Sequence, residues 1–214
     1  MYINFALGNY DNTDDTVLSN TESVFKRVER GDEFIINAAD YIHDYNNIQC
    51  ILYNASRIMY LDGLGNFECK QFILGAASKL SVLKLGSSTY VNHSMTDINN
   101  LGLDTGLPLL EELDLSNIEF GYNDENGNWI SNPPQTFALE NFPLLKKLDA
   151  TGSNIRSFTF KDGGMLEHIV FPSILTKIEF KNLYNLIDTY DDNNELIPAV
   201  ELTGTANLIS YNST

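Results

Sequence analysis

The sequence predicts a mainly β protein in which short strands and bends repeat as the coils of a parallel β-solenoid. Two observations indicate this fold class. Apolar residues recur at the first, fourth and sixth positions of a hexad, and Asn, Gly, Asp and Pro cluster between the hexads. Side chains alternate across a strand, so the fourth and sixth positions face the same side. The polar clusters are typical of tight bends that lead the chain to its next strand.

The clearest hexads form a first set along the chain. They are Leu80-Leu83-Leu85, Leu110-Leu113-Leu115, Leu145-Leu148-Ala150 and Leu166-Ile169-Phe171, with looser copies that start at Ile58, Ile187 and Leu208. The starts from Leu145 onward are evenly spaced, which predicts about six coils of roughly 21 residues each.

A second set of hexads lies between the members of the first. It comprises Ile98-Leu101-Leu103, Ile155-Phe158-Phe160, Leu175-Ile178-Phe180 and Ile197-Val200-Leu202, with weaker members that begin at Phe67 and Phe137. Each coil therefore holds two strands, and coils must stack because one hexad cannot bury its apolar side alone. Extra length is tolerated at surface bends, which predicts loop insertions at 86–97 and 116–136.

The strings LSVLKL, LEELDL and LKKLDA, each followed by a polar bend, resemble the L-x-x-L-x-L core of leucine-rich repeats. The irregular repeats of bacterial surface proteins and phage proteins are the most similar, over about residues 48–214. The Asn or Cys position of that family is met loosely by Asn117, and the second hexad replaces a helical half-repeat. The resemblance implies a virion or tail component assembled in the cytoplasm, or an adhesin fragment at the bacterial cell surface that binds a host protein or glycan.

The two ends of the chain are expected to differ from the repeats. Residues 1–47 lack the hexads and predict a partly helical cap, with helices over Ser19–Arg30 and Asp40–Tyr45. The whole fold is thus expected to be an α/β solenoid, mainly β, with a short helical N-terminal cap. Because a repeat begins at Leu208 near the last residue, we expect an open C-terminal coil that is covered by a protein partner, a neighbouring subunit or a further segment of a longer natural chain.

Charge excludes some classes of partner. The chain has 13 basic and 29 acidic residues and a formal net charge of -16. Such a surface repels phosphate backbones and anionic headgroups, so neither nucleic acid nor membrane is expected. A basic protein, a metal ion or a neutral glycan remains compatible. The start at Met1 has no basic or apolar leader, which predicts a cytoplasmic origin unless the chain is a fragment.

No constellation of residues indicates an enzyme, a cofactor or a metal site. His43, His93 and His168 lack partners at ligand or triad spacing. The acidic segment before Trp129 fails as an EF-hand because Trp129 and Gln135 stand where Gly and Glu are required. The dipeptide at 126–127, Asn-Gly, instead predicts a hairpin turn. Calcium at the acidic loops stays an open alternative.

The best candidates for partner binding are aromatic and polar residues of the two insertions, namely Tyr90, His93, Tyr122 and Trp129. Aromatic groups on projecting loops bury much area at low entropic cost. The alternative is that Trp129 folds back onto its own coil. The sequence therefore predicts a non-catalytic structural or protein-interaction module.

Overall fold

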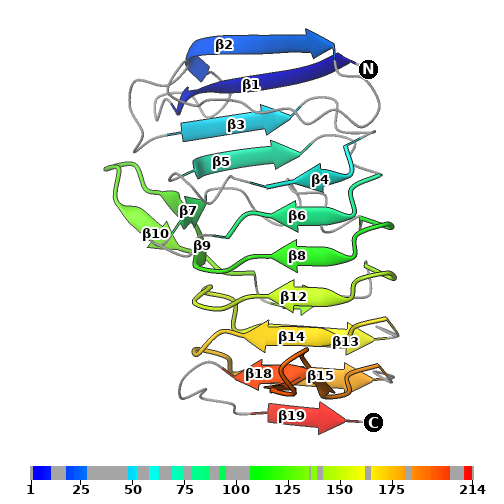
Figure 1. Cartoon of the computed structure of the whole chain (residues 1–214). Helices are drawn as coiled ribbons and strands as arrows, with labels where there is room; N and C mark the ends of the chain where they lie inside the picture. The colour runs from blue at the N-terminus through cyan, green and yellow to red at the C-terminus, as the bar shows by residue number, and fades with distance from the viewer. Residues whose placement is uncertain are drawn as a thin grey trace.

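Five hexads of the first set and one of the second form a parallel sheet of six short strands in the computed structural model (Figure 1). In chain order they are β4 (Tyr60–Leu61), β6 (Val82–Lys84), β8 (Glu112–Asp114), β12 (Lys147–Asp149), β14 (His168–Phe171) and β18 (Val200–Leu202). The structure describes residues 2–10, 18–27, 48–52, 58–62, 69–74, 79–86, 92–94, 107–134, 136–138, 142–161, 165–181, 185–202 and 210–213. Each strand of this sheet lies beside the next in the chain, as expected of successive repeats.

The fourth hexad positions stand in register across this sheet. Leu83 pairs with Leu113, Leu113 with Leu148, and Leu148 with Ile169. All four side chains are buried. The first and sixth positions of the same hexads are buried too, which confirms the prediction from the sequence. Burial of each such aliphatic side chain stabilises the fold by roughly 1.5–3 kcal/mol, so this row is a main source of stability.

A second parallel sheet packs against the first. It contains β11 (Phe137–Ala138), β13 (Ser157–Lys161), β15 (Lys177–Lys181) and β19 (Ser210–Ser213), in that order. The ring of Phe171, from β14, meets Phe158, from β13, edge to face at a centroid distance of 5.2 Å. Phe160 contacts Phe171 in the same way at 6.0 Å. These aromatic residues hold the two sheets face to face.

Two hairpins interrupt the parallel strands. In the first, β9 (Ile118–Asn123) pairs antiparallel with β10 (Trp129–Ser131) and parallel with β7 (Asn92–Ser94). In the second, β16 (Thr189–Tyr190) pairs antiparallel with β17 (Leu196–Ile197). Figure 1 shows the first hairpin at the left of the stacked strands and the second, in dark orange, in front of β15 and β18.

The helix predicted over 19–30 is wrong. That segment contains the strand β2 (Leu18–Arg27), which pairs antiparallel with β1 (Tyr2–Tyr10). β1 also pairs with β3 (Ile48–Leu52), which lies parallel to β5 (Cys69–Leu74). The apolar residues between 18 and 28 are too few to distinguish the period of a helix from that of a strand. Pairing with the distant strand β1 favours the strand conformation.

The described residues are thus mainly β with parallel sheets and contain no helix. Within this part of the chain, no helical segment has the length and apolar content required to cross a lipid bilayer. The second predicted helix, at 40–45, lies outside the described residues, as does the hexad that starts at Ile98.

The hexads near the C-terminus belong to the opposite sets from those predicted. Ile187 is 66% exposed and begins no strand of the six-stranded sheet. Instead Val200 takes the register position next to Ile169, and β19 pairs with β15 in the other sheet. The hairpin β16–β17 inserts residues between the two strands, so the even spacing of the hexad starts does not continue past Leu166.

The bends after two of these strands share one geometry. The carboxylate Oδ1 of Asp114 accepts a hydrogen bond from the backbone N–H of Ser116 at 2.8 Å, and Asp149 does the same for Thr151 at 2.8 Å. The residues that follow, Asn117 and Gly152, have φ of 54° and 68°. Asn and Gly tolerate this left-handed conformation, which explains their place after the L-x-x-L-D core.

Candidate protein-interaction surface

The first hairpin turns at an aspartate. The Oδ1 atom of Asp124 accepts hydrogen bonds from the backbone N–H groups of Asn126 at 2.9 Å and Asn128 at 2.8 Å. These donors lower the pKa of Asp124, with the bond from Asn128 as the largest cause. Gly127 has φ of 80°, as required in a hairpin loop of this length. The turn predicted from the Asn-Gly pair is confirmed.

The structure brings two of the predicted partner-binding residues onto this hairpin. Tyr122 is 46% exposed in β9, while Trp129 in β10 is partly buried. A Cβ placed on Gly121 would come within 2.6 Å of Trp129 Cζ2, so the indole lies on the backbone of its own hairpin. His93 is in β7, opposite Glu119 of β9. Tyr90 lies outside the described residues.

A side-chain amide attaches the first hairpin to the core. Asn154 Oδ1 accepts a hydrogen bond from the backbone N–H of Phe120 at 3.0 Å, and its Nδ2 donates to the Phe120 carbonyl at 2.8 Å. The same Nδ2 donates to Ser131 Oγ at 3.0 Å. Ile118 and Phe120 are buried, so the segment 116–136, predicted as an insertion, also supplies core residues.

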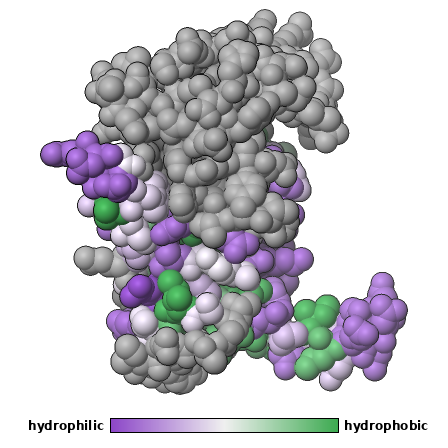
Figure 2. Space-filling model, turned by 90° about the vertical axis from the view of Figure 1, so that its left-hand side faces the viewer, coloured by the Kyte–Doolittle hydropathy of each residue, from purple (hydrophilic) through white to green (hydrophobic). Residues whose placement is uncertain are grey.

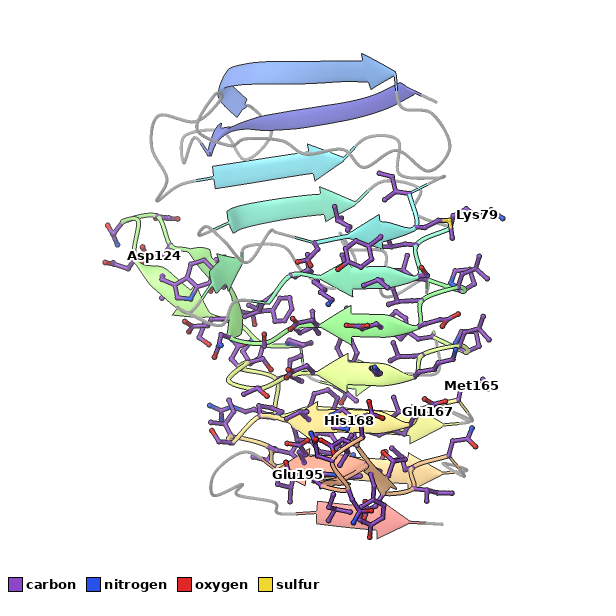
Figure 3. The ribbon with its side chains drawn as sticks, viewed as in Figure 1. Lys79, Asp124, Met165, Glu167, His168 and Glu195 are labelled. Carbon is purple, nitrogen blue, oxygen red and sulfur yellow. The ribbon has the colours of Figure 1, made fainter. Side chains whose placement is uncertain are left out.

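The second hairpin turns in the same way. Asp191 Oδ1 accepts hydrogen bonds from the backbone N–H groups of Asn193 and Glu195, each at 2.8 Å. The bond from Glu195 is the largest cause that lowers the pKa of Asp191. Asn194 takes the left-handed position, with φ of 62°. Figure 3 labels Asp124 and Glu195, which mark the two turns.

The second hairpin differs from the first in what covers it. Both residues of β16 and both residues of β17 are exposed, among them Tyr190 at 65% and Leu196 at 55%. Figure 2 shows this hairpin as an arm at the lower right, with hydrophobic residues behind a hydrophilic tip. Large apolar side chains gathered on one projecting element are typical of surfaces that bind other proteins.

The strand after this hairpin, β18, is the last strand of the six-stranded sheet among the described residues. Val200 continues the row of Ile169 yet is 39% exposed, and Leu202 continues the position of Phe171 yet is 52% exposed. The hexad pattern predicts that these two residues are buried, so the sequence did not predict their exposure. The signal available was the segment Asp191–Glu195, whose Asp and Asn residues resemble the turn at Asp124.

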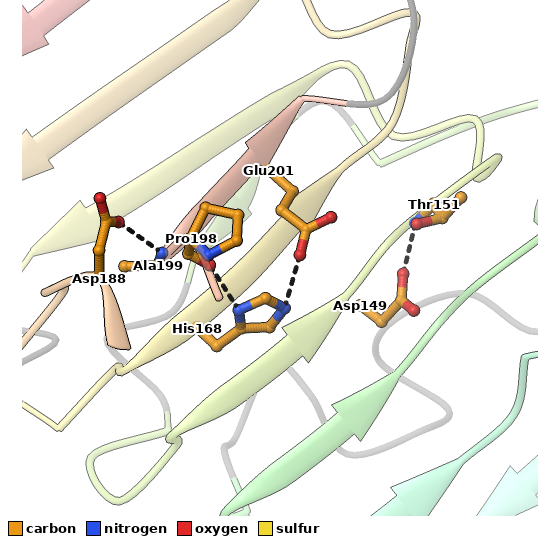
Figure 4. A network of polar contacts seen from close by, with 7 residues as sticks. All are labelled: Asp149, Thr151, His168, Asp188, Pro198, Ala199 and Glu201. Carbon is orange, nitrogen blue, oxygen red and sulfur yellow. Dashed lines mark hydrogen bonds and ion pairs between the residues drawn. The ribbon is translucent and has the colours of Figure 1, made fainter. Parts of the chain in front are cut away.

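Polar contacts hold β18 on its neighbour (Figure 4). The carbonyl of Pro198 accepts a hydrogen bond from His168 Nδ1 at 3.0 Å, which requires the proton on that nitrogen. His168 Nε2 lies 3.6 Å from Glu201 Oε1. Asp188 Oδ1 accepts a hydrogen bond from the backbone N–H of Ala199 at 2.9 Å, which ties the base of the hairpin to the strand.

The outer side of the six-stranded sheet carries paired charges. Lys84 Nζ lies 3.2 Å from Glu112 Oε1, and Lys146 Nζ lies 2.7 Å from Glu111 Oε2. The hydrogen bonds to these carboxylates raise the pKa of both lysines. Such solvent-exposed pairs contribute little to stability, so this side favours solubility over packing.

Metal-binding side chains do not gather in the described part of the chain. No group of three or more His, Cys, Asp or Glu side chains that could hold a metal ion occurs among these residues. Comparison of the chain with protein-family models, curated proteins and solved structures finds no match. The exposed apolar side chains of β16, β17 and β18 form the candidate interaction surface among the described residues.

Proposed function

We propose that this chain is a non-catalytic protein-interaction module of a larger assembly, built as a parallel β-solenoid of irregular leucine-rich repeats. The in-register leucines of β6, β8 and β12 support the solenoid. Each is buried, and from β11 to β19 the strands of the two parallel sheets alternate along the chain, with only the hairpin β16–β17 between them. This alternation is what a coil of two strands and two bends requires.

The observation that carries the interaction role is the set of exposed apolar side chains between Ile187 and Leu202. It consists of Ile187, Tyr190, Leu196, Ile197, Val200 and Leu202. Aromatic and aliphatic side chains bind partners by removing apolar area from water. Tyr122, exposed on the first hairpin, offers a second contact point.

A photocrosslinking experiment tests this role. We replace Leu196, Tyr122 or Met165 with photoreactive benzoylphenylalanine in cells that make the protein naturally. Met165 is 39% exposed, lies outside both hairpin segments just before β14, and serves as the control position. We expect a discrete protein adduct from Leu196 or Tyr122 and none from Met165. Absence of an adduct at both hairpins would contradict the proposal.

The adduct also identifies the assembly. The resemblance to leucine-rich repeats of phage proteins makes a virion or tail the assembly that we favour. Identification of a capsid or tail protein by mass spectrometry would support it. An adduct with an external host protein would instead assign the chain to a bacterial surface adhesin.

A further inference from the structure

The end of the six-stranded sheet offers backbone groups as well as apolar side chains. The carbonyl of Ala199 accepts a hydrogen bond from the N–H of Ile169 in β14 at 2.9 Å. In a parallel strand, alternate residues direct their backbone groups to opposite neighbours. The N–H and carbonyl groups of Val200 and Leu202 therefore face the edge of the sheet that lies away from β14.

The exposed side chains at this edge determine which positions of an added strand need to be apolar. Val200 and Leu202 point to the interior side, as Ile169 and Phe171 do, because they share their register positions. Ile169 and Phe171 are fully buried, whereas Val200 and Leu202 are 39% and 52% exposed. An added strand with apolar residues at alternate positions would cover both, since side chains of a strand alternate between its two sides.

The charge around this edge specifies the partner further. Residues 185–202 contain no Lys or Arg, and their five carboxylates are Asp188, Asp191, Asp192, Glu195 and Glu201. The net charge of -16 disfavours a second copy of the chain as the added strand. A basic segment is attracted by the same charges, and complementary potentials raise the rate and the specificity of association.

From these observations we infer that β18 binds an extended, basic segment of another protein, which adds to the six-stranded sheet as its next strand. The partner segment has apolar residues at alternate positions to cover Val200 and Leu202, and Lys or Arg between them. The hairpin β16–β17 flanks the segment with Leu196 and its carboxylates. This inference rests on the proposed function and names the partner class and the binding edge.

A peptide titration of the full chain tests the inference. The probes are two fluorescein-labelled peptides of equal length, one of alternating Val and Lys and one of alternating Val and Glu. We expect the Val-Lys peptide to bind, measured by fluorescence anisotropy, and the Val-Glu peptide to bind at least about 10-fold more weakly. Added salt should weaken the binding of the Val-Lys peptide.

Two protein variants separate strand addition from general attraction to an acidic surface. L202D and M165D add the same charge at partly exposed positions. We expect L202D to lose at least about 10-fold in affinity for the Val-Lys peptide, although its added charge attracts lysine, while M165D keeps wild-type affinity. Equal binding by both variants, or no binding by the wild type, would overturn the inference.

The two proposals fail separately. An adduct at Tyr122 in the crosslinking experiment, together with no loss of peptide binding in L202D, would leave the interaction role standing and reject the edge of β18. The absence of adducts at both hairpins would reject the interaction role itself.

Discussion

The hairpins β9–β10 and β16–β17 have the same turn but different surroundings. In each turn, an aspartate side chain accepts hydrogen bonds from two backbone N–H groups. The residue just before the second donor, Gly127 or Asn194, has a positive φ. The first hairpin is joined to the core by Asn154 and covered by Trp129. The second leaves its strands exposed. A local turn therefore forms from local sequence, whereas its use as core or as surface depends on the residues that pack against it.

The largest expected effect is on the free energy of unfolding. It is tested by comparing a buried residue with a partly exposed residue at the same hexad position. L148A should lower the free energy of unfolding by about 2–5 kcal/mol, because the leucine is fully buried in register with Leu113. V200A, at the same hexad position of β18, should cost less than about 1 kcal/mol because the valine is already partly hydrated. Urea denaturation followed by circular dichroism measures both. Equal losses would show that the end of the sheet is covered.

The close packing of the first hairpin gives the next effect. A Cβ on Gly121 would meet Trp129 and the Ile130 carbonyl, so G121A should lower the free energy of unfolding by about 1–3 kcal/mol. G127A is the matched control. A Cβ at position 127 would meet no other atom, so the alanine is strained only by the positive φ. It should cost about 1 kcal/mol. A milder effect at Gly121 than at Gly127 would contradict the packing of the indole on the hairpin.

Removal of the amide of Asn154 tests the attachment of the first hairpin. N154A leaves the backbone N–H and carbonyl of Phe120 without their side-chain partner, at a cost of about 1–3 kcal/mol. The fluorescence of Trp129, the single tryptophan, should shift to longer wavelength as the indole gains water. N193A, in the exposed turn of the second hairpin, should change neither quantity. An unchanged spectrum in N154A would separate the indole from this attachment.

The smallest effect concerns pH. Asp124 has a pKa below its ordinary value of 3.8, because the folded turn donates hydrogen bonds to the carboxylate. Its stabilisation of the turn is therefore present above pH 3.8 and is lost as the pH falls through the lower, folded value. Trp129 fluorescence should report this loss in the wild type. D124N should remove this acid transition, and its persistence would assign the transition to other carboxylates.

Much of the fold could be predicted from the order of residues. The hexads at Leu80, Leu110, Leu145 and Leu166 identify strands, register and core, because a two-residue period and a polar bend are local properties. The turn at 126–127 follows from the same local chemistry. Of the candidate site, the sequence predicted Tyr122 as an exposed contact but assigned Val200 and Leu202 to a buried hexad.

Other features were decided by contacts between distant residues. The segment at 18–27 is a strand because it pairs with β1. Val200 belongs to the six-stranded sheet because β18 pairs with β14, in which Ile169 is its register partner. Neither choice can be read from the segment alone, since short apolar runs fit more than one period. The sequence by itself determined where the chain bends and which side of each hexad is apolar. Only the tertiary structure decided which apolar sides are covered, because coverage depends on what stacks next to each strand.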